Sequence, residues 1–129
     1  MDRHKQVRTD APVLIVDDEV LMVEFVERVL ATAGYTRLMT ATSGEAAIDL
    51  CIKQGMPTLL VTDFKMPRMD GDELAAELRR RDPDLKVLYL TGFADTLFRN
   101  KEVLWEGEAY LEKPCTVTGL LEAVSLLLV

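Results

Sequence analysis

Short apolar runs alternate with segments of helical periodicity along the chain, and this alternation most restricts the fold that the chain can adopt. Five runs have the length and continuity of strands that are buried on both faces. They are expected at Val13–Val16, Thr36–Ala41, Thr58–Thr62, Val87–Leu90 and Ala109–Leu111. Since each run is followed by a stretch that suits a helix, the pattern predicts an α/β domain with a five-stranded parallel sheet between helices.

The helical segments carry their own start and stop signals. Apolar residues recur at helical spacing from Met22 to Ala33, and Gly34 follows them as a C-terminal cap. Ser43 is placed as an N-cap before the next helix. The other helices are expected at Glu45–Gln54, around Leu74–Leu78, at Asp95–Leu104, and from Thr116 or Thr118 to about Leu128.

Length and charge exclude several classes of protein. The 129 residues suit one domain that needs no disulfides, with a polar lead-in over residues 1–11 and a folded part over residues 12–129. A net charge of −7 argues against a direct nucleic-acid partner. No apolar run has the length of a membrane span, and Cys51 and Cys115 have no disulfide or metal-site spacing. We therefore expect a cytoplasmic protein that does not insert into a membrane.

Polar side chains follow the expected strands at the points where these strands end. They are Asp17 and Asp18 after the first strand, Asp63 after the third, Thr91 after the fourth and Lys113 after the fifth. Because ligands bind beyond the carboxyl ends of the strands in an open parallel sheet, we expect these side chains to converge on one edge.

The chemistry of this set is restrictive. Three carboxylates held close together repel one another unless a cation is present, and Mg²⁺ is bound through carboxylates and waters. One carboxylate can act as a nucleophile and form an aspartyl phosphate, while an ammonium and a hydroxyl group hold phosphoryl oxygens. The residues alone leave two interpretations open: a Mg²⁺-dependent phosphoryl-acceptor site, or ordinary helix caps and turns.

Four motifs, in this order and at these strand ends, resemble the response regulator receiver domain of two-component signalling. They are Val16-Asp17-Asp18-Glu19, the segment from Asp63 to Gly71, Thr91-Gly92, and Tyr110-Leu111-Glu112-Lys113-Pro114. The resemblance covers about Pro12 to Leu128. It implies a flavodoxin-like (βα)5 doubly wound sandwich whose strand order, 2-1-3-4-5, is carried over from the family.

The resemblance implies an acceptor and a metal site. Asp63 matches the aspartate that accepts the phosphoryl group. Asp18, Asp63 and the backbone carbonyl of Lys65 match the protein ligands of Mg²⁺ or Mn²⁺, and Asp17 matches the acid that acts on the metal through water.

It also implies a switch. Lys113 matches the lysine that bonds the phosphoryl group, Thr91 the switch hydroxyl, and Tyr110 the aromatic residue that changes rotamer with it. The Lys113-Pro114 peptide bond is cis in many such domains, as proline permits. Asp70-Gly71 is interpreted as a turn and helix cap only.

The partners implied are a sensor histidine kinase or a histidine phosphotransfer protein, whose phosphohistidine donates to Asp63. Phosphorylation then shifts the surface of the fourth helix, fifth strand and fifth helix between two populations, and the same face is a candidate homodimer contact. Such a domain is regulatory rather than an enzyme, because its only activities are self-phosphorylation and self-dephosphorylation. It is a bacterial regulator by itself, or a part of a larger one or of a hybrid sensor histidine kinase.

Two further predictions concern rate and docking. Lys65 and Phe93 lie two residues after Asp63 and Thr91, where receivers flank the path of the attacking water. A long cation and a bulky ring obstruct that path, so we expect slow self-dephosphorylation. The first helix also carries extra apolar residues, Val20, Leu21 and Val23, which indicate either an exposed docking cluster for the donor or a broader buried face.

Three other functions compete with this interpretation. The first is a receiver-like interaction scaffold that is never phosphorylated, against which the intact acid set argues. The second is a phosphatase of the haloacid dehalogenase type, which needs a second acid two residues after its nucleophilic aspartate and a cap domain. Position 19 is Glu, and no cap domain fits in the chain. The third, a flavin-binding relative, lacks a Ser/Thr/Gly-rich phosphate loop after the first strand.

Overall fold

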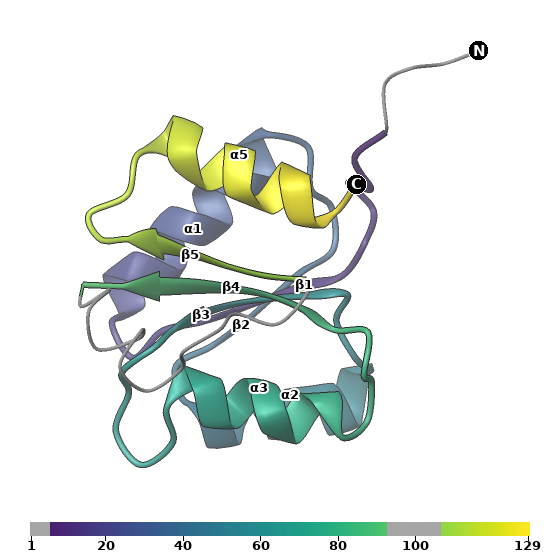
Figure 1. Cartoon of the computed structure of the whole chain (residues 1–129), viewed down its shortest axis with the longest axis vertical. Coiled ribbons are helices and arrows are strands. Elements are labelled where there is room, and N and C mark those ends of the chain that lie inside the picture. The colour runs from purple at the N-terminus through teal and green to yellow at the C-terminus, as the bar shows by residue number, and fades with distance from the viewer. Residues whose placement is uncertain (1–5, 93–106) are drawn as a thin grey trace.

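The computed structural model describes residues 6–92 and 107–129, and five strands form its centre (Figure 1). The strands are β1 (Val13–Val16), β2 (Leu38–Ala41), β3 (Leu59–Asp63), β4 (Lys86–Thr91) and β5 (Glu108–Glu112). They form one parallel sheet in the order β2-β1-β3-β4-β5, which confirms the strand order that the family resemblance implied.

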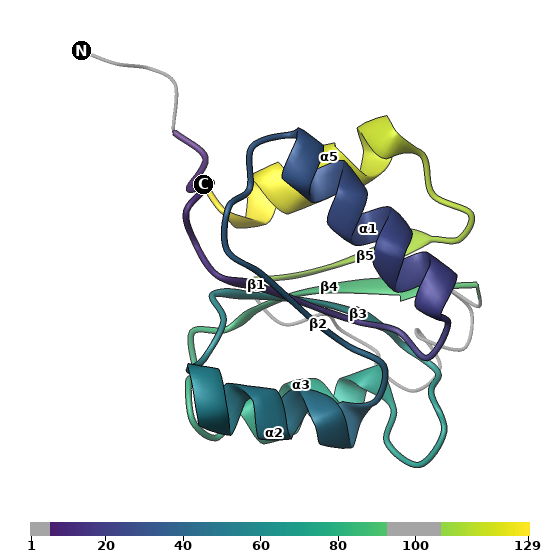
Figure 2. The same ribbon diagram turned by 180° about the vertical axis from the view of Figure 1, so that it is seen from behind.

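Helices cover both faces of the sheet. The described helices are α1 (Val20–Thr32), α2 (Gly44–Gln54), α3 (Gly71–Arg79) and α5 (Val117–Leu127). Figures 1 and 2 show α1 and α5 on one face and α2 and α3 on the other. The helix expected over Asp95–Leu104 lies outside the described residues. Of the helices in residues 6–92 and 107–129, none is long and apolar enough to cross a membrane.

The sheet separates two hydrophobic cores. Val13 and Ile15 of β1 face α1 and α5, while Leu14 and Val16 face α2 and α3, and all four are at most 1% exposed. Successive side chains of a strand point to opposite faces. A strand covered on both faces must therefore be apolar throughout, which is why the runs in the sequence are continuous rather than alternating.

The observed boundaries follow the local signals closely. Ser43 caps α2, since its hydroxyl accepts a hydrogen bond from the Ala46 N–H at 3.1 Å. Thr116, rather than Thr118, caps α5 and accepts from the Gly119 N–H at 2.9 Å. The second strand begins at Leu38, two residues later than expected, because the Thr36 N–H donates to Thr9 O outside the sheet.

The strands that carry the site extend further than their apolar runs. Asp63 pairs with Leu90 as the last residue of β3, and Thr91 pairs with Glu112 as the last residue of β4. The sheet ladder therefore fixes the backbone of both polar residues, whereas the sequence placed them just beyond the strands.

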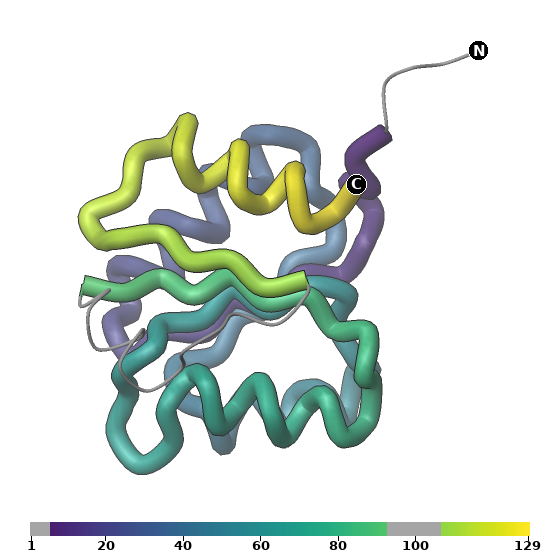
Figure 3. The backbone as a smooth tube through the Cα atoms, viewed as in Figure 1, coloured from purple at the N-terminus to yellow at the C-terminus, as the bar shows by residue number. Residues whose placement is uncertain are grey.

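The segment before β1 lies across the end of α5. The backbone N–H of Arg8 donates to Leu128 O at 3.0 Å, and its Nε approaches the same oxygen at 3.4 Å. Ala11 is 5% exposed, and Val7 packs against the core on the α1 and α5 side. Both ends of the described chain therefore lie together, at the edge where the strands begin (Figure 3).

Candidate functional site

The carboxyl ends of four neighbouring strands place the predicted residues along one edge of the sheet. Asp17 and Asp18 follow β1, and Asp63 and Thr91 end β3 and β4, while Lys113 follows β5. Asp17 and Thr91 are 1% exposed and Asp63 is 8% exposed, whereas Asp18 is exposed to solvent. The site is thus an acidic pocket with one open side.

Three carboxylates meet in this pocket. One oxygen from each of Asp17, Asp18 and Asp63 lies within 4.8 Å of the other two. Burial and the negative charge of Asp17 raise the pKa of Asp63 from its ordinary value of 3.8 to about 6. Burial also raises the pKa of Asp17, although Lys113 and the Glu19 N–H oppose this. A divalent cation would relieve both costs, so the three residues fit a Mg²⁺ site.

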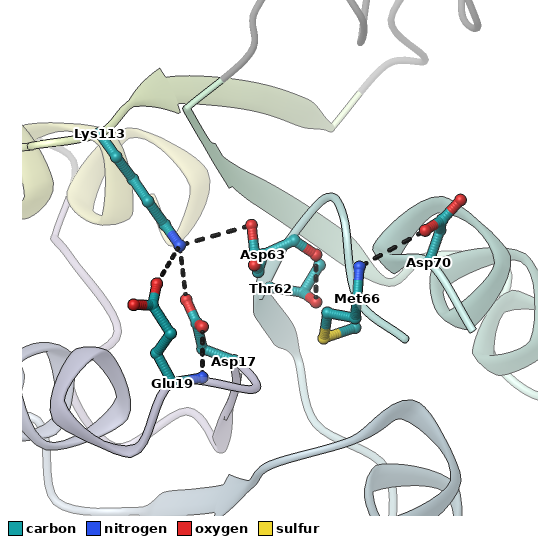
Figure 4. Close-up of polar contacts among 7 residues, drawn as sticks. All are labelled: Asp17, Glu19, Thr62, Asp63, Met66, Asp70 and Lys113. Carbon is teal, nitrogen blue, oxygen red and sulfur yellow. Dashed lines mark hydrogen bonds and ion pairs between the residues drawn. The ribbon is translucent and has the colours of Figure 1, made fainter. Parts of the chain in front are cut away.

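Lys113 lies beside Asp17 and Asp63 and brings a positive charge to these acids (Figure 4). Its Nζ is 2.9 Å from Asp17 Oδ2 and 3.4 Å from Asp63 Oδ1. Burial lowers the pKa of Lys113, but the hydrogen bond to Asp17 and the charge of Asp63 outweigh it, so that the pKa is raised overall. The ammonium group therefore stays charged beside the Asp63 carboxylate.

Backbone contacts fix these side chains. Asp17 Oδ1 accepts the Glu19 N–H at 2.9 Å, which leaves Oδ2 for Lys113. The Lys113 N–H donates to Thr91 O at 2.9 Å and so ties the lysine to the end of β4. The Lys113-Pro114 bond is cis, as predicted.

The loop between β3 and α3 shapes the floor of the pocket. The Gly71 N–H donates to Phe64 O at 2.8 Å, and Asp70 is the N-cap residue of α3, as the sequence predicted. A Cβ on Gly71 would lie 2.2 Å from Asp63 O, so only glycine allows the loop to approach Asp63 this closely. The sequence predicted only a turn and helix cap at Asp70-Gly71. The feature of the sequence that could have indicated this close approach is an Asp-Gly pair soon after a strand.

The remaining predicted residues take the following positions. Lys65 is exposed in the loop after Asp63, and Tyr110 is partly buried on β5. Phe93 lies outside the described residues. Val20 and Leu21 are 55% and 80% exposed.

For Val23, the structure supports the broader buried face, which is one of the two interpretations that the sequence left open for the first helix. It is only 6% exposed and belongs to the core between the sheet and α1 and α5. Helical spacing turns it inward, together with Val26. The exposed part of the cluster is therefore limited to Val20 and Leu21.

One contact of the site was missed from the sequence. Glu19 Oε1 lies 3.7 Å from Lys113 Nζ, at the solvent side of the pocket. No contact of Glu19 with Lys113 was predicted, because the two residues are 94 positions apart and local sequence patterns do not record such a contact.

Comparisons with known proteins agree with this geometry. The chain matches the response regulator receiver domain family over residues 13–125. It is 31% identical to the response regulator receiver protein CpdR of Brucella abortus, over 91% of this chain and 96% of that protein. It is 33% identical to the sensor kinase CckA of the same species, over 88% of this chain.

Solved structures give the same result. A response regulator receiver protein from Sinorhizobium medicae superposes with a TM-score of 0.80 at 30% identity, over 92% of this chain and 94% of that one. The receiver domain of the hybrid histidine kinase CckA superposes with a TM-score of 0.77 at 27% identity, over 92% and 99% of the two chains.

Some relatives are much longer than this chain. It spans 41% of a probable transcriptional regulator, ycf27, from Guillardia theta and 12% of the sensor kinase CckA, but nearly all of CpdR. What is shared in each case is the domain described above. The strand order, the acidic pocket and the family match lead to one conclusion: the chain belongs to the response regulator receiver domains of two-component systems.

Proposed function

We propose that the domain accepts a phosphoryl group on Asp63 from a phosphohistidine of a sensor histidine kinase or histidine phosphotransfer protein, in a Mg²⁺-dependent reaction. The observation that carries the proposal is the position of Asp63. Its carboxylate lies between two further acids and an ammonium group 3.4 Å away. Such a site combines a nucleophile, a place for a divalent cation and a fixed positive charge.

The transfer exchanges one bond for another. An oxygen of the Asp63 carboxylate attacks phosphorus, the bond from phosphorus to the imidazole nitrogen breaks, and the imidazole leaves. Lys113 can follow the phosphoryl oxygens because its ammonium group already contacts Asp63. Asp18, Asp63 and the Lys65 carbonyl would hold Mg²⁺, with Asp17 acting on the ion through water, and the bound ion would supply charge neutralisation. Hydrolysis of the aspartyl phosphate would reset the domain.

The proposed switch uses Thr91 and Tyr110. Thr91 pairs with Glu112, and Tyr110 lies two residues before Glu112, so both side chains belong to the same face of the sheet. Movement of Thr91 toward a phosphoryl group would open space beside Tyr110. The surface formed by β5, α5 and the segment before β5 would then shift from one conformation toward another. This shift would alter its contacts with partners or with a second copy of the chain.

The exposed pair Val20 and Leu21 supports docking of the donor. Both residues begin α1 directly after the acidic pocket, and exposed apolar side chains at such a position suit contact with a helix that carries the phosphohistidine. We propose a regulatory rather than an enzymatic role for residues 12–129, in the bacterial cytoplasm and without direct contact to nucleic acid.

The decisive experiment measures intact mass after incubation with acetyl phosphate or phosphoramidate and Mg²⁺. We expect one phosphoryl adduct that requires Mg²⁺ and is absent in Asp63→Asn. If no adduct forms under conditions that label a known receiver, the domain is either a phosphorylation-independent scaffold or a site that Lys65 and Phe93 close to small donors, and labelling of Lys65→Asn and Phe93→Glu separates the two. The family match already favours a receiver over the phosphatase alternative.

The lifetime of the adduct tests the roles of Lys65 and Phe93. Lys65 is exposed two residues after the acceptor, where its long side chain can obstruct the attacking water. We expect Lys65→Asn and Phe93→Glu each to accelerate the decay of the phosphorylated protein, followed by intact mass over time. Unchanged decay rates would contradict this role.

A further inference from the structure

Glu19 contacts the cation on which the proposed reaction depends. Its Oε1 is 3.7 Å from Lys113 Nζ, and its side chain is 72% exposed, whereas that of Lys113 is 18% exposed. Asp63 Oδ1 is 3.4 Å from the same ammonium group. In Figure 4 the dashed lines from Lys113 Nζ to Glu19 and to Asp63 run to opposite sides. Asp17 Oδ2 is closer still, at 2.9 Å, so three carboxylates share one cation and Glu19 is the exposed one among them.

The fold, rather than this ion pair, determines where Glu19 lies. Its backbone N–H donates to Asp17 Oδ1 at 2.9 Å, and its carbonyl accepts the Met22 N–H at 3.0 Å in the first turn of α1. Glu19 is the N-cap residue of α1, but its side chain makes no capping hydrogen bond. The carboxylate is thus held at the open side of the pocket by a fixed backbone and remains available to Lys113.

We propose that Glu19 is a positioning residue that draws part of the Lys113 ammonium charge away from Asp63, and that it thereby slows phosphorylation by small anionic donors. It acts in addition to the hydrogen bond from Lys113 to Asp17. The inference rests on the function proposed above. A small donor such as acetyl phosphate must draw Lys113 away from Glu19 with its own charge alone. A docked protein donor excludes water and contributes binding energy from its whole interface, so the same competition affects it less. Glu19 would therefore favour protein donors over small ones.

The test compares two substitutions that change the net charge equally. Glu19→Gln removes the ion pair with Lys113, while Glu24→Gln removes an exposed acid elsewhere on the same helix. Rates of labelling by acetyl phosphate are measured by intact mass at fixed Mg²⁺. We expect Glu19→Gln to react about twofold to fivefold faster, as the strength of an exposed ion pair allows, and Glu24→Gln to match the unmodified protein.

A third variant separates positioning from simple charge repulsion of the donor. Glu19→Asp keeps the negative charge at the open side of the pocket, but its side chain is one methylene shorter and loses the contact with Lys113. If Glu19 acts by holding Lys113, Glu19→Asp accelerates labelling as Glu19→Gln does. A rate for Glu19→Asp equal to that of the unmodified protein would overturn the positioning role.

The failure of this inference is distinct from the failure of the proposed function. Equal rates for Glu19→Gln and Glu24→Gln overturn the inference, while labelling of the unmodified protein still supports the phosphoacceptor site. Absence of labelling in the unmodified protein and in Lys65→Asn and Phe93→Glu contradicts the proposed function itself. Thermal unfolding of each variant verifies that the fold is intact, which we expect because both glutamates are exposed.

Discussion

Two requirements on the protonation state of Asp63 oppose each other. The proposed function requires this buried carboxylate to be ionised, yet burial and the charge of Asp17 favour its protonated form. Lys113 opposes this effect only in part, because it bonds Asp17 more closely than Asp63. The ionised form of Asp63 is therefore disfavoured by burial and by repulsion from Asp17, and a bound cation would reduce this cost.

This leads to a prediction about pH. Because the pKa of Asp63 is raised from 3.8 to about 6, the folded state binds this proton more tightly than the unfolded state does. Without metal, the contribution of Asp63 to the free energy of unfolding is fully present below pH 3.8 and is lost as the pH rises through about 6. Mg²⁺ needs the ionised form, so its affinity falls as the pH drops below that value.

Thermal unfolding with and without Mg²⁺ checks the prediction. We expect Mg²⁺ to raise the melting temperature clearly at pH 8 and only weakly at pH 5. Asp63→Asn serves as the control, since it removes the titrating group and most of the difference between the two pH values. An equal effect of Mg²⁺ at both pH values in the unmodified protein would contradict the raised pKa.

At the scale of the elements, the contact between the β3–α3 loop and the strand end can be tested with two glycines. A Cβ on Gly71 would meet the backbone oxygen of Asp63, whereas a Cβ on Gly44 would meet the flexible side chain of Met69 at 2.5 Å. We expect Gly71→Ala to lower the free energy of unfolding by about 3 kcal/mol and Gly44→Ala by about 1 kcal/mol or less. Urea denaturation measures both, and similar losses would mean that the loop can move away.

A cluster of polar side chains connects α3 to the edge strand β5. Its members are Asp72, Arg79, Tyr89 and Glu108. Arg79 Nη1 is 2.6 Å from Glu108 Oε2, and the Glu108 side chain is fully buried. The Tyr89 hydroxyl lies 3.2 Å from both Asp72 Oδ1 and Glu108 Oε2, and burial and the charge of Glu108 raise the pKa of the phenol. These contacts hold the start of β5 against α3.

Arg79 is therefore expected to matter far more than its neighbour. Arg79→Ala removes a close partner of a buried carboxylate, and we expect a loss of about 3 kcal/mol in the free energy of unfolding. Arg80→Ala removes only an exposed pair with Glu77, 3.4 Å apart, and should cost less than about 0.5 kcal/mol. Urea denaturation of the two variants compares these costs, and a small loss for Arg79→Ala would contradict a stabilising role for this cluster of polar side chains.

At the scale of the whole molecule, the described strands and helices and the positions of the acids and the lysine could be predicted from the sequence pattern, whereas the strand order came from the family resemblance. Strands buried on both faces leave continuous apolar runs, and their ends mark one edge of the sheet. Contacts between segments that are separate in the sequence produce no comparable pattern of apolar residues. The approach of Gly71 to Asp63 and the pairing of Arg79 with Glu108 depend on how the helices pack, which local periodicity does not record.

The joining of Arg8 to Leu128 has a consequence for how the domain is built into longer polypeptides. Both ends leave the fold at the edge where the strands begin, while Asp63 lies at the edge where they end (Figure 2). The six residues of β4 correspond to a separation of about 20 Å. A fused tag or neighbouring domain would therefore start far from the edge that carries Asp63 and leave that edge accessible to the proposed donor. A conformational change that begins at Asp63 would have to extend along the strands to the opposite edge of the sheet before it reached such a neighbour.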